Sequence, residues 1–194
     1  MKLFRSKQAN SLTELVKACQ KQDHQAQVQL YERYKGRLMG ICLRYARTEA
    51  EAEDIFQEGI LKIFDRIGDL KKPESVDSWV KTVMIRYAID YYNQVTKGQK
   101  QLISTDYIET EWESDDYQNL FSKLHTEVLL ETINELPEGY RMVINLYFVD
   151  GYSHAEIAQL LGISEGTSRS QLLRGRNLLI KKLDLKGVKQ HEKF

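Results

Sequence analysis

The sequence has 194 residues, enough for one or two domains, and its 42% hydrophobic and 29% charged residues indicate a chain that can fold around a core. Its net charge is zero, which at face value argues against nucleic-acid binding. No apolar run approaches the roughly 18 residues that a membrane helix needs, and residues 1–10 lack the apolar core of a signal peptide. We therefore expect a cytoplasmic chain without membrane insertion.

The charge distribution changes this interpretation. Residues 1–100 carry 18 basic and 13 acidic side chains, residues 101–150 carry 2 and 11, and residues 151–194 carry 8 and 4. Attraction to phosphates depends on the local field, so a balanced total does not exclude DNA binding. The pattern predicts two domains, at 10–96 and 119–186, joined by a flexible acidic linker at 97–118 and followed by a tail at 187–194.

The scarcity of proline and the spacing of the apolar residues favour an all-α fold of two small helical domains. Prolines occur only at Pro73 and Pro137, and alternating or valine-rich runs are absent. Cys19 and Cys42 lack the spacing of a metal site or a disulfide framework, so we expect core or partly buried thiols, no metal and no cofactor.

The first domain begins with a short helix after Ser11 and continues with two longer helices. The second helix repeats apolar residues every three to four positions: Val28, Tyr31, Tyr34, Leu38, Ile41, Cys42 and Tyr45. The third, Glu49 to Ile67, is predicted to direct inward Phe56, Ile60, Ile63, Phe64 and Ile67. These stripes predict a helical bundle.

The third helix has a second face that combines acidic and apolar side chains. It consists of Asp54, Gln57, Glu58 and Leu61. Spacing alone favours a solvent-exposed polar face, with a docking surface as the alternative.

After a turn at Lys71 to Glu74, a helix is predicted from Val76 to about Asn93. The residues of this helix expected to face the bundle are Trp79, Val83, Ala88 and Ile89. The residues expected to lie wholly or partly on the surface are Lys81, Arg86, Tyr87, Tyr91 and Tyr92. Rings beside cations suit single-stranded nucleic acid, because bases stack on the rings and phosphates meet the charges. Packing of these aromatic residues in the core is the alternative.

Residues 97–118 lose apolar periodicity and turn acidic, as expected of a solvated tether. The second domain is expected to begin near Tyr117 with a helix to Glu135, followed by a break at residues 136–139. Another helix, Tyr140 to Val149, is predicted to pack through Val143, Ile144, Tyr147 and Phe148.

Residues 152–183 have the pattern of a helix-turn-helix. Ser153 and Glu156 form a capping box that starts a helix, and Gly162 supplies a left-handed C-terminus. Ser164 then offers an N-cap to a second helix, so a turn of three to four residues separates the pair. His154 is expected to be exposed, with a role near the DNA backbone as the alternative.

The second helix, Glu165 to Leu183, has a net charge of +4. In a helix-turn-helix the first residues of this helix reach base edges, which here are Thr167, Ser168, Arg169 and Gln171, while Arg174 and Arg176 suit phosphates. A glutamine amide favours adenine, which predicts an A-rich element at the position that Gln171 reads. The alternative is a solvated basic face.

Three stretches resemble a known family. Leu136 to Leu183, LPEGYRMVINLYFVDGYSHAEIAQLLGISEGTSRSQLLRGRNLLIKKL, is similar to region 4 of the extracytoplasmic-function (ECF) group of bacterial sigma factors, close to the Bacteroidetes type. Ala52 to Phe64, AEDIFQEGILKIF, is similar to the DxxQE helix of sigma region 2. The helix that starts at Val76 resembles the part of region 2 that opens and reads the minus-10 promoter element.

The resemblance implies partners and roles. Core RNA polymerase would be bound through its β′ coiled coil and β flap, with the coiled coil docked by Asp54, Gln57 and Glu58. The minus-35 element would be bound by Thr167, Ser168, Arg169, Gln171, Arg174 and Arg176. The minus-10 element would be bound, with the loop at 71–78, by Trp79, Lys81, Arg86 and Tyr87.

The resemblance further implies an anti-sigma partner and a linker in the RNA channel of the polymerase. Four positions depart from the family pattern: Val76 stands where Phe is common, Arg86 where Asn is usual, Asn93 where Arg is frequent, and Gln171 where many members carry Arg. These departures bear on promoter preference rather than on docking.

We therefore interpret the chain as an ECF-type sigma factor that directs core polymerase to promoters. The alternatives are a stand-alone helix-turn-helix regulator, which would normally dimerise on palindromic half-sites, and a helical adaptor that binds only protein. No phosphate-binding glycine loop, nucleophile elbow or catalytic histidine arrangement is found, so an enzyme is not expected.

Overall fold

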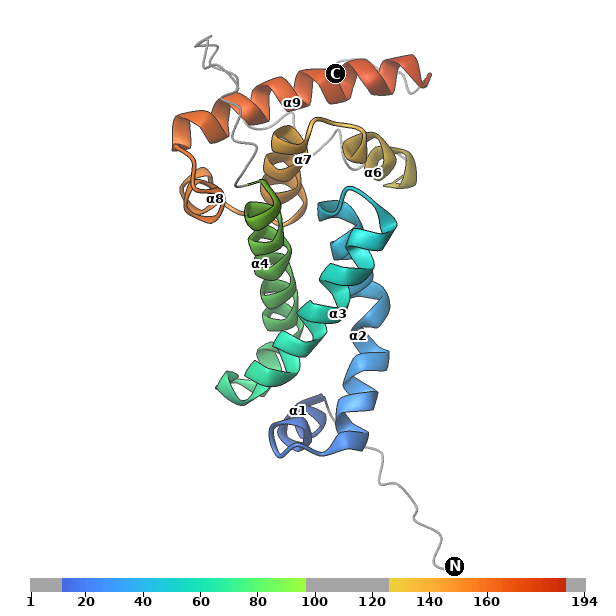
Figure 1. Cartoon of the computed structure of the whole chain (residues 1–194), viewed down its shortest axis with the longest axis vertical. Helices are drawn as coiled ribbons and strands as arrows, with labels where there is room; N and C mark the ends of the chain where they lie inside the picture. The colour runs from blue at the N-terminus through green and yellow to red at the C-terminus, as the bar shows by residue number, and fades with distance from the viewer. Residues whose placement is uncertain (1–11, 97–125, 188–194) are drawn as a thin grey trace, which may run out of the picture. The chain divides into compact units, whose positions relative to one another are not determined.

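The computed structural model describes residues 12–96 and 126–187, and the regular elements within these ranges are all helical (Figure 1). The prediction of an all-α chain is confirmed. The chain divides after Val95 into two compact units. The predicted linker 97–118, the predicted helix start near Tyr117 and residues 188–194 of the predicted tail lie outside the described residues. Among the described helices, none has the length and apolar character to cross a membrane.

The first unit is built from helices joined by short turns. In chain order these are α1 (Leu12–Gln20), α2 (His24–Tyr45), α3 (Glu49–Arg66), the 3₁₀ turns η1 (Ile67–Asp69) and η2 (Pro73–Ser75), and α4 (Val76–Thr96). Side-chain caps define where α2 and α3 begin. Asp23 accepts a hydrogen bond from the N–H of Ala26 at 3.0 Å, and Thr48 accepts one from the N–H of Glu51 at 3.2 Å. These bonds satisfy backbone donors that the first turn of a helix leaves open.

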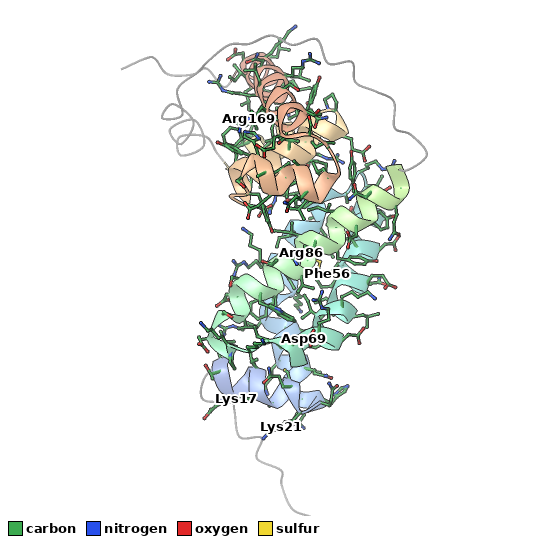
Figure 2. All side chains as sticks on the ribbon, turned by 90° about the vertical axis from the view of Figure 1, so that its left-hand side faces the viewer. Lys17, Lys21, Phe56, Asp69, Arg86 and Arg169 are labelled. Carbon is green, nitrogen blue, oxygen red and sulfur yellow. The ribbon has the colours of Figure 1, made fainter. Side chains whose placement is uncertain are left out.

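The core of the first unit lies between α2, α3 and α4, with Phe56 inside it (Figure 2). The predicted stripe of α2 is confirmed at Tyr34, Leu38, Ile41, Cys42 and Tyr45 and wrong at Val28, which is 48% exposed. On α3, Phe56, Ile63 and Ile67 are buried as predicted, whereas Ile60 and Phe64 are only partly buried.

The predicted orientation of α4 is partly wrong. Trp79 and Val83 are only partly buried, and the buried stripe instead consists of Val76, Val80, Met84, Ile85, Ala88 and Ile89. Steps of four residues along this stripe keep its members on one side of the helix. The prediction was wrong because Trp79 and Val80 are both apolar neighbours, and only the bundle decides which of them is enclosed.

Polar bonds tie the ends of the unit together. The Gln20 side chain at the end of α1 donates to the carbonyl oxygens of Ile67 at 3.1 Å and Leu70 at 2.9 Å. The Tyr34 hydroxyl on α2 donates to Asp77 on α4 at 2.9 Å, and burial together with this carboxylate raises the pKa of Tyr34. Neighbouring elements of the first unit are therefore held together by these hydrogen bonds as well as by apolar contacts.

Both cysteines lie inside the first unit, as predicted. Cys19 and Cys42 are fully buried, and the Cys42 Sγ lies 3.4 Å from the Sδ of Met84 on α4. Burial raises the pKa of Cys19 to about 11 and that of Cys42 to about 12.

The second unit comprises α6 (Thr126–Asn134), α7 (Glu138–Ile144), the π-helical turn η3 (Asn145–Val149), α8 (His154–Leu161) and α9 (Glu165–Leu185). The predicted helix from Tyr140 to Val149 is therefore an α-helix that widens into a π turn. In Figure 1, α6 and α7 lie along one side of the long α9. Their shared core consists of Leu129, Ile133, Leu136, Ile144, Leu179 and Leu183.

An ion-pair cluster closes the end of this core away from α8. Glu135, just after α6, accepts hydrogen bonds from Lys182 at 2.9 Å and Lys186 at 2.7 Å. These two bonds lower the pKa of Glu135, Lys186 contributing more than Lys182. The C-terminal half of α9 is thus fixed by apolar packing and by charge.

Candidate functional site

The helix-turn-helix forms as its local signals predict. The N–H of Glu156 donates to the Ser153 hydroxyl at 3.3 Å, and the N–H of Ser153 donates to the Glu156 carboxylate at 2.8 Å. The backbone and side-chain bonds from Ser153 lower the pKa of Glu156. Gly162 ends α8 with a φ of 65°, a conformation that glycine adopts without steric cost.

The second helix of the motif also begins as predicted. The Ser164 hydroxyl accepts from the N–H of Thr167 at 2.9 Å and lies 2.8 Å from the Thr167 hydroxyl. Thr167 is partly buried, so its side chain belongs to this cap as well as to the surface. Only Ile163 and Ser164 separate the cap of α8 from the first residue of α9.

The face of α9 that packs on the unit includes one residue predicted to bind DNA. Ser168 is fully buried, together with Gly175, Leu179 and Leu183. Intervals of seven and four residues bring these positions to one side of the helix. The prediction of Ser168 as a base contact is therefore wrong, because its polarity was weighed and its position in the buried stripe was not.

Ser168 is bonded to a residue that the sequence analysis placed on the surface. The Nδ1 atom of His154 lies 2.9 Å from the Ser168 hydroxyl oxygen. The imidazole also stacks on the Tyr147 ring, with centroids 4.8 Å apart and planes inclined by 22°. Burial, and then the positive charge of Arg169, lower the pKa of His154. The expectation that His154 is exposed is therefore wrong, because the side chain is partly buried, whereas a role near the DNA backbone stays a prediction.

The remaining predicted residues of α9 surround the buried stripe. Arg169 is exposed (Figure 2) and its guanidinium lies 3.4 Å from Glu165 in a solvent-exposed pair. Arg174 and Arg176 are partly buried, as is Gln171, whose amide lies beside Gly139 at the start of α7. Asn177, which the sequence analysis did not single out, is exposed nine residues after Ser168, a step that leads to the opposite side of the helix.

The residues predicted for α4 do not share one face. Trp79 and Arg86 are seven positions apart and lie on the same side, with Arg86 exposed (Figure 2). Lys81 is about 200° around the helix from Trp79. Tyr87 contacts the α3 side, because its ring lies 3.7 Å from where a Cβ on Gly59 would be.

The acidic face of α3 is exposed as predicted. Asp54, Gln57 and Glu58 are exposed, and Leu61 beside them is 57% exposed. Positions three, four and seven residues apart project from one side of a helix. Tyr87 borders this face, because burial and then the charge of Glu58, with a smaller effect of Asp54, raise its pKa.

Two family models match the chain, one in each unit. Residues 30–97 match sigma-70 region 2, and residues 126–179 match sigma-70 region 4. Together these segments cover more than half of the sequence.

Named relatives extend the match over most of the chain. The RNA polymerase sigma-H factor of Pseudomonas aeruginosa is 25% identical over 179 residues, 88% of this chain and 92% of the relative. The ECF RNA polymerase sigma-E factor of Escherichia coli is 28% identical over 179 residues, 87% of this chain and 92% of the relative. A solved complex of the sigma factor RpoE with the anti-sigma factor NepR from Bartonella quintana is 21% identical with a TM-score of 0.48, covering 84% of this chain and 97% of that one.

Proposed function

The chain belongs to the sigma-70 family, as an RNA polymerase sigma factor of the ECF group, and from this premise we propose which of its surfaces carry the function. It binds core RNA polymerase and directs transcription initiation at specific promoters. We further propose that it is of the Bacteroidetes type, on the similarity of residues 136–183 to that type.

We propose that the acidic face of α3 binds the β′ coiled coil of the polymerase. Asp54, Gln57 and Glu58 supply charge and hydrogen-bond acceptors, and the exposed Leu61 supplies an apolar contact at the same face. Apolar area surrounded by polar groups is the usual composition of a protein interface. The β flap is the expected partner of the second unit.

We propose that α4 and the loop at 71–78 bind the minus-10 element. The support is the shared outer face of Trp79 and Arg86, on which a flipped base can stack beside a cation. Lys81 would meet phosphates on a neighbouring side, and Tyr87 would contact DNA only from the edge that it shares with α3.

We propose that α9 reads the minus-35 element in the major groove. Thr167, Arg169 and Gln171 would contact base edges, and Arg174 and Arg176 would hold the phosphate backbone. Ser168 is left out because it is enclosed within the unit. A base preference for adenine opposite Gln171 stays a prediction, tested by selecting binding sites for the Gln171→Arg variant.

The observation that carries the assignment of α9 is the doubly capped helix-turn-helix, whose second helix presents Arg169 to solvent. Catalysis would belong to the polymerase, so the chain itself would not be an enzyme. A cytoplasmic location and an anti-sigma partner would accompany this role, as is usual in the ECF group.

The test is run-off transcription by purified bacterial core polymerase on a promoter library, with and without the protein. Discrete new start sites, lost when Gln57 and Glu58 are both replaced by alanine, are expected. A Glu49→Ala and Glu53→Ala double variant on the same helix is the matched control. Unchanged transcripts, combined with binding of the protein alone to DNA as a dimer, would favour a stand-alone regulator instead.

A further inference from the structure

The contact between His154 and Ser168 has a role that neither residue's polarity alone suggests. We propose that His154 is a positioning residue for minus-35 recognition, which fixes the rotation of α9 through Ser168 and so sets the base preference of that helix. This inference rests on the proposed role of α9 at the minus-35 element.

The bond joins the two helices of the motif at the position where DNA would be read. His154 is the first residue of α8 and Ser168 is the fourth residue of α9. Their 2.9 Å contact is the length of a good hydrogen bond, and the buried Ser168 hydroxyl is shielded from competing water. Thr167 and Arg169, which flank Ser168, are both proposed to contact bases.

The imidazole is itself held in place. It stacks on Tyr147 of η3, so the π turn supports one face of the ring while Nδ1 points at α9. A change of the His154 χ1 rotamer would break both this stack and the contact with Ser168. The ring therefore connects η3, α8 and α9 through one side chain.

Apolar packing constrains the N-terminal half of α9 less than its C-terminal half, because Leu172, which packs against the core there, is only partly buried. The fully buried positions of the helix are Ser168, Gly175, Leu179 and Leu183, so the large buried side chains all lie in the C-terminal half. A glycine offers no side chain to resist rotation. A directional hydrogen bond at Ser168 supplies that resistance where the base-contacting residues are.

Small rotations of α9 about its own axis displace the side chains that would contact bases. Side-chain atoms of a helix lie about 5–6 Å from its axis, so a rotation of about 20° moves them by about 2 Å. This displacement is enough to lose a hydrogen bond to a base edge, whose length must stay near 3 Å. Contacts to phosphates, made by long and flexible arginine side chains, tolerate it better.

Burial, and after it the charges around the imidazole, favour its neutral form. Arg169 faces it from α9 and disfavours a second positive charge, whereas Glu165 acts in the opposite direction more weakly. The N-terminus of α8, where His154 lies, also disfavours a cation. A neutral imidazole fits this environment, and its Nδ1 can bond to the Ser168 hydroxyl as acceptor or as donor, depending on the tautomer.

The experiment compares base discrimination rather than total activity. The full chain is combined with bacterial core polymerase, and run-off transcripts are sequenced from a promoter library randomised in its upstream element. For each variant, the ratio of transcription from the preferred element to that from single-base changes is measured. A variant that merely folds less well lowers transcription from all templates alike and leaves this ratio unchanged.

We expect His154→Phe, which keeps a ring for Tyr147, and Ser168→Ala each to lower the ratio about threefold to tenfold, the range of one hydrogen bond. The double variant should lose no more than either single variant. His154→Asn, whose side chain can still bond to Ser168, should recover part of the ratio. His24→Phe is the matched control, because His24 is likewise the first residue of a helix and is exposed.

Two results would overturn the inference: an unchanged ratio in both single variants, or losses that add in the double variant. A wild-type protein that initiates transcription without preference at the upstream element would instead overturn the role of α9, and the inference with it. The wild-type ratio therefore separates the two failures.

Discussion

Gly175 of α9 crosses Tyr140 of α7 so closely that a Cβ added to the glycine would lie 2.9 Å from the Tyr140 Cβ. The same added atom would lie 2.9 Å from the Cδ1 of Ile144. The Tyr140 Cβ is next to the backbone and cannot move aside by a change of rotamer. The close crossing of α7 and α9 therefore depends on glycine in the middle of a helix, where glycine is otherwise unfavourable.

Gly175→Ala is expected to destabilise the second unit by about 1–3 kcal/mol, because the helices must separate to accept the methyl group. Thermal unfolding followed by circular dichroism measures the effect. Gly36→Ala on α2 is the control, since nothing lies within 4 Å of its added Cβ and alanine favours a helix by up to about 1 kcal/mol. Equal effects of the two changes would contradict the steric explanation.

Glu135→Gln is expected to lower the melting temperature at neutral pH and to have little effect in acid. The folded-state pKa of Glu135 is lowered by Lys186 and Lys182. Its contribution is therefore complete above the ordinary value of 4.5 and is lost as the pH falls through the lower folded-state pKa. The ion pairs of Glu135 with Lys182 and Lys186 lie at the surface, so the change in melting temperature should be small and should shrink with added salt.

Melting temperatures of the two proteins across this pH range provide the measurement. Glu131→Gln, at an exposed carboxylate on the preceding helix α6, serves as the comparison. A constant difference between wild type and Glu135→Gln at all pH values would argue for a packing effect instead.

Stability should also fall below about pH 6.5 because of His154. Its pKa is lowered in the folded chain from an ordinary value of 6.5, so the unfolded chain binds more protons once the pH drops below that value. Stability from this group is complete above pH 6.5 and declines as the pH falls toward the folded-state pKa. Denaturation midpoints of wild type and His154→Phe, measured between about pH 7.5 and 5.5, should converge as the pH falls. Parallel curves would exclude His154 as the titrating group.

Leu61→Ala is expected to weaken binding to core polymerase without lowering the melting temperature. The side chain is 57% exposed, so little packing is lost, whereas an apolar contact in an interface is worth about 1–2 kcal/mol. Fluorescence anisotropy of the labelled full chain with core polymerase measures the affinity. Leu43→Ala, 43% exposed on α2, is the matched control and should bind as the wild type does. Equal losses at the two leucines would place the docking surface elsewhere.

The features predicted correctly are those that depend on a few neighbouring residues. Ser153 and Glu156 cap a helix wherever a helix follows them, and Gly162 ends one because of its own backbone freedom. The acidic face of α3 follows from helical spacing alone. All three appear in the structure as expected.

The features predicted wrongly depend on residues distant in the sequence. Trp79 and Val80 are adjacent apolar residues, and their own positions do not show which one the other helices enclose. His154 lies 14 residues from Ser168 in the sequence, and its imidazole contacts the Ser168 hydroxyl only because α8 and α9 pack together. The interval from Ser168 to Gly175 and Leu179 was the one available signal that Ser168 is buried.

The placement of the two cysteines bears on which stimuli the chain can detect. A thiol reacts with peroxides as the thiolate and needs access to solvent. Cys19 and Cys42, the two cysteines of the sequence, are fully enclosed, with pKa values raised to about 11 and about 12. Neither thiol is placed to react with peroxides in the folded protein. A response of this sigma factor to oxidants would therefore not begin at either thiol while the first unit stays folded.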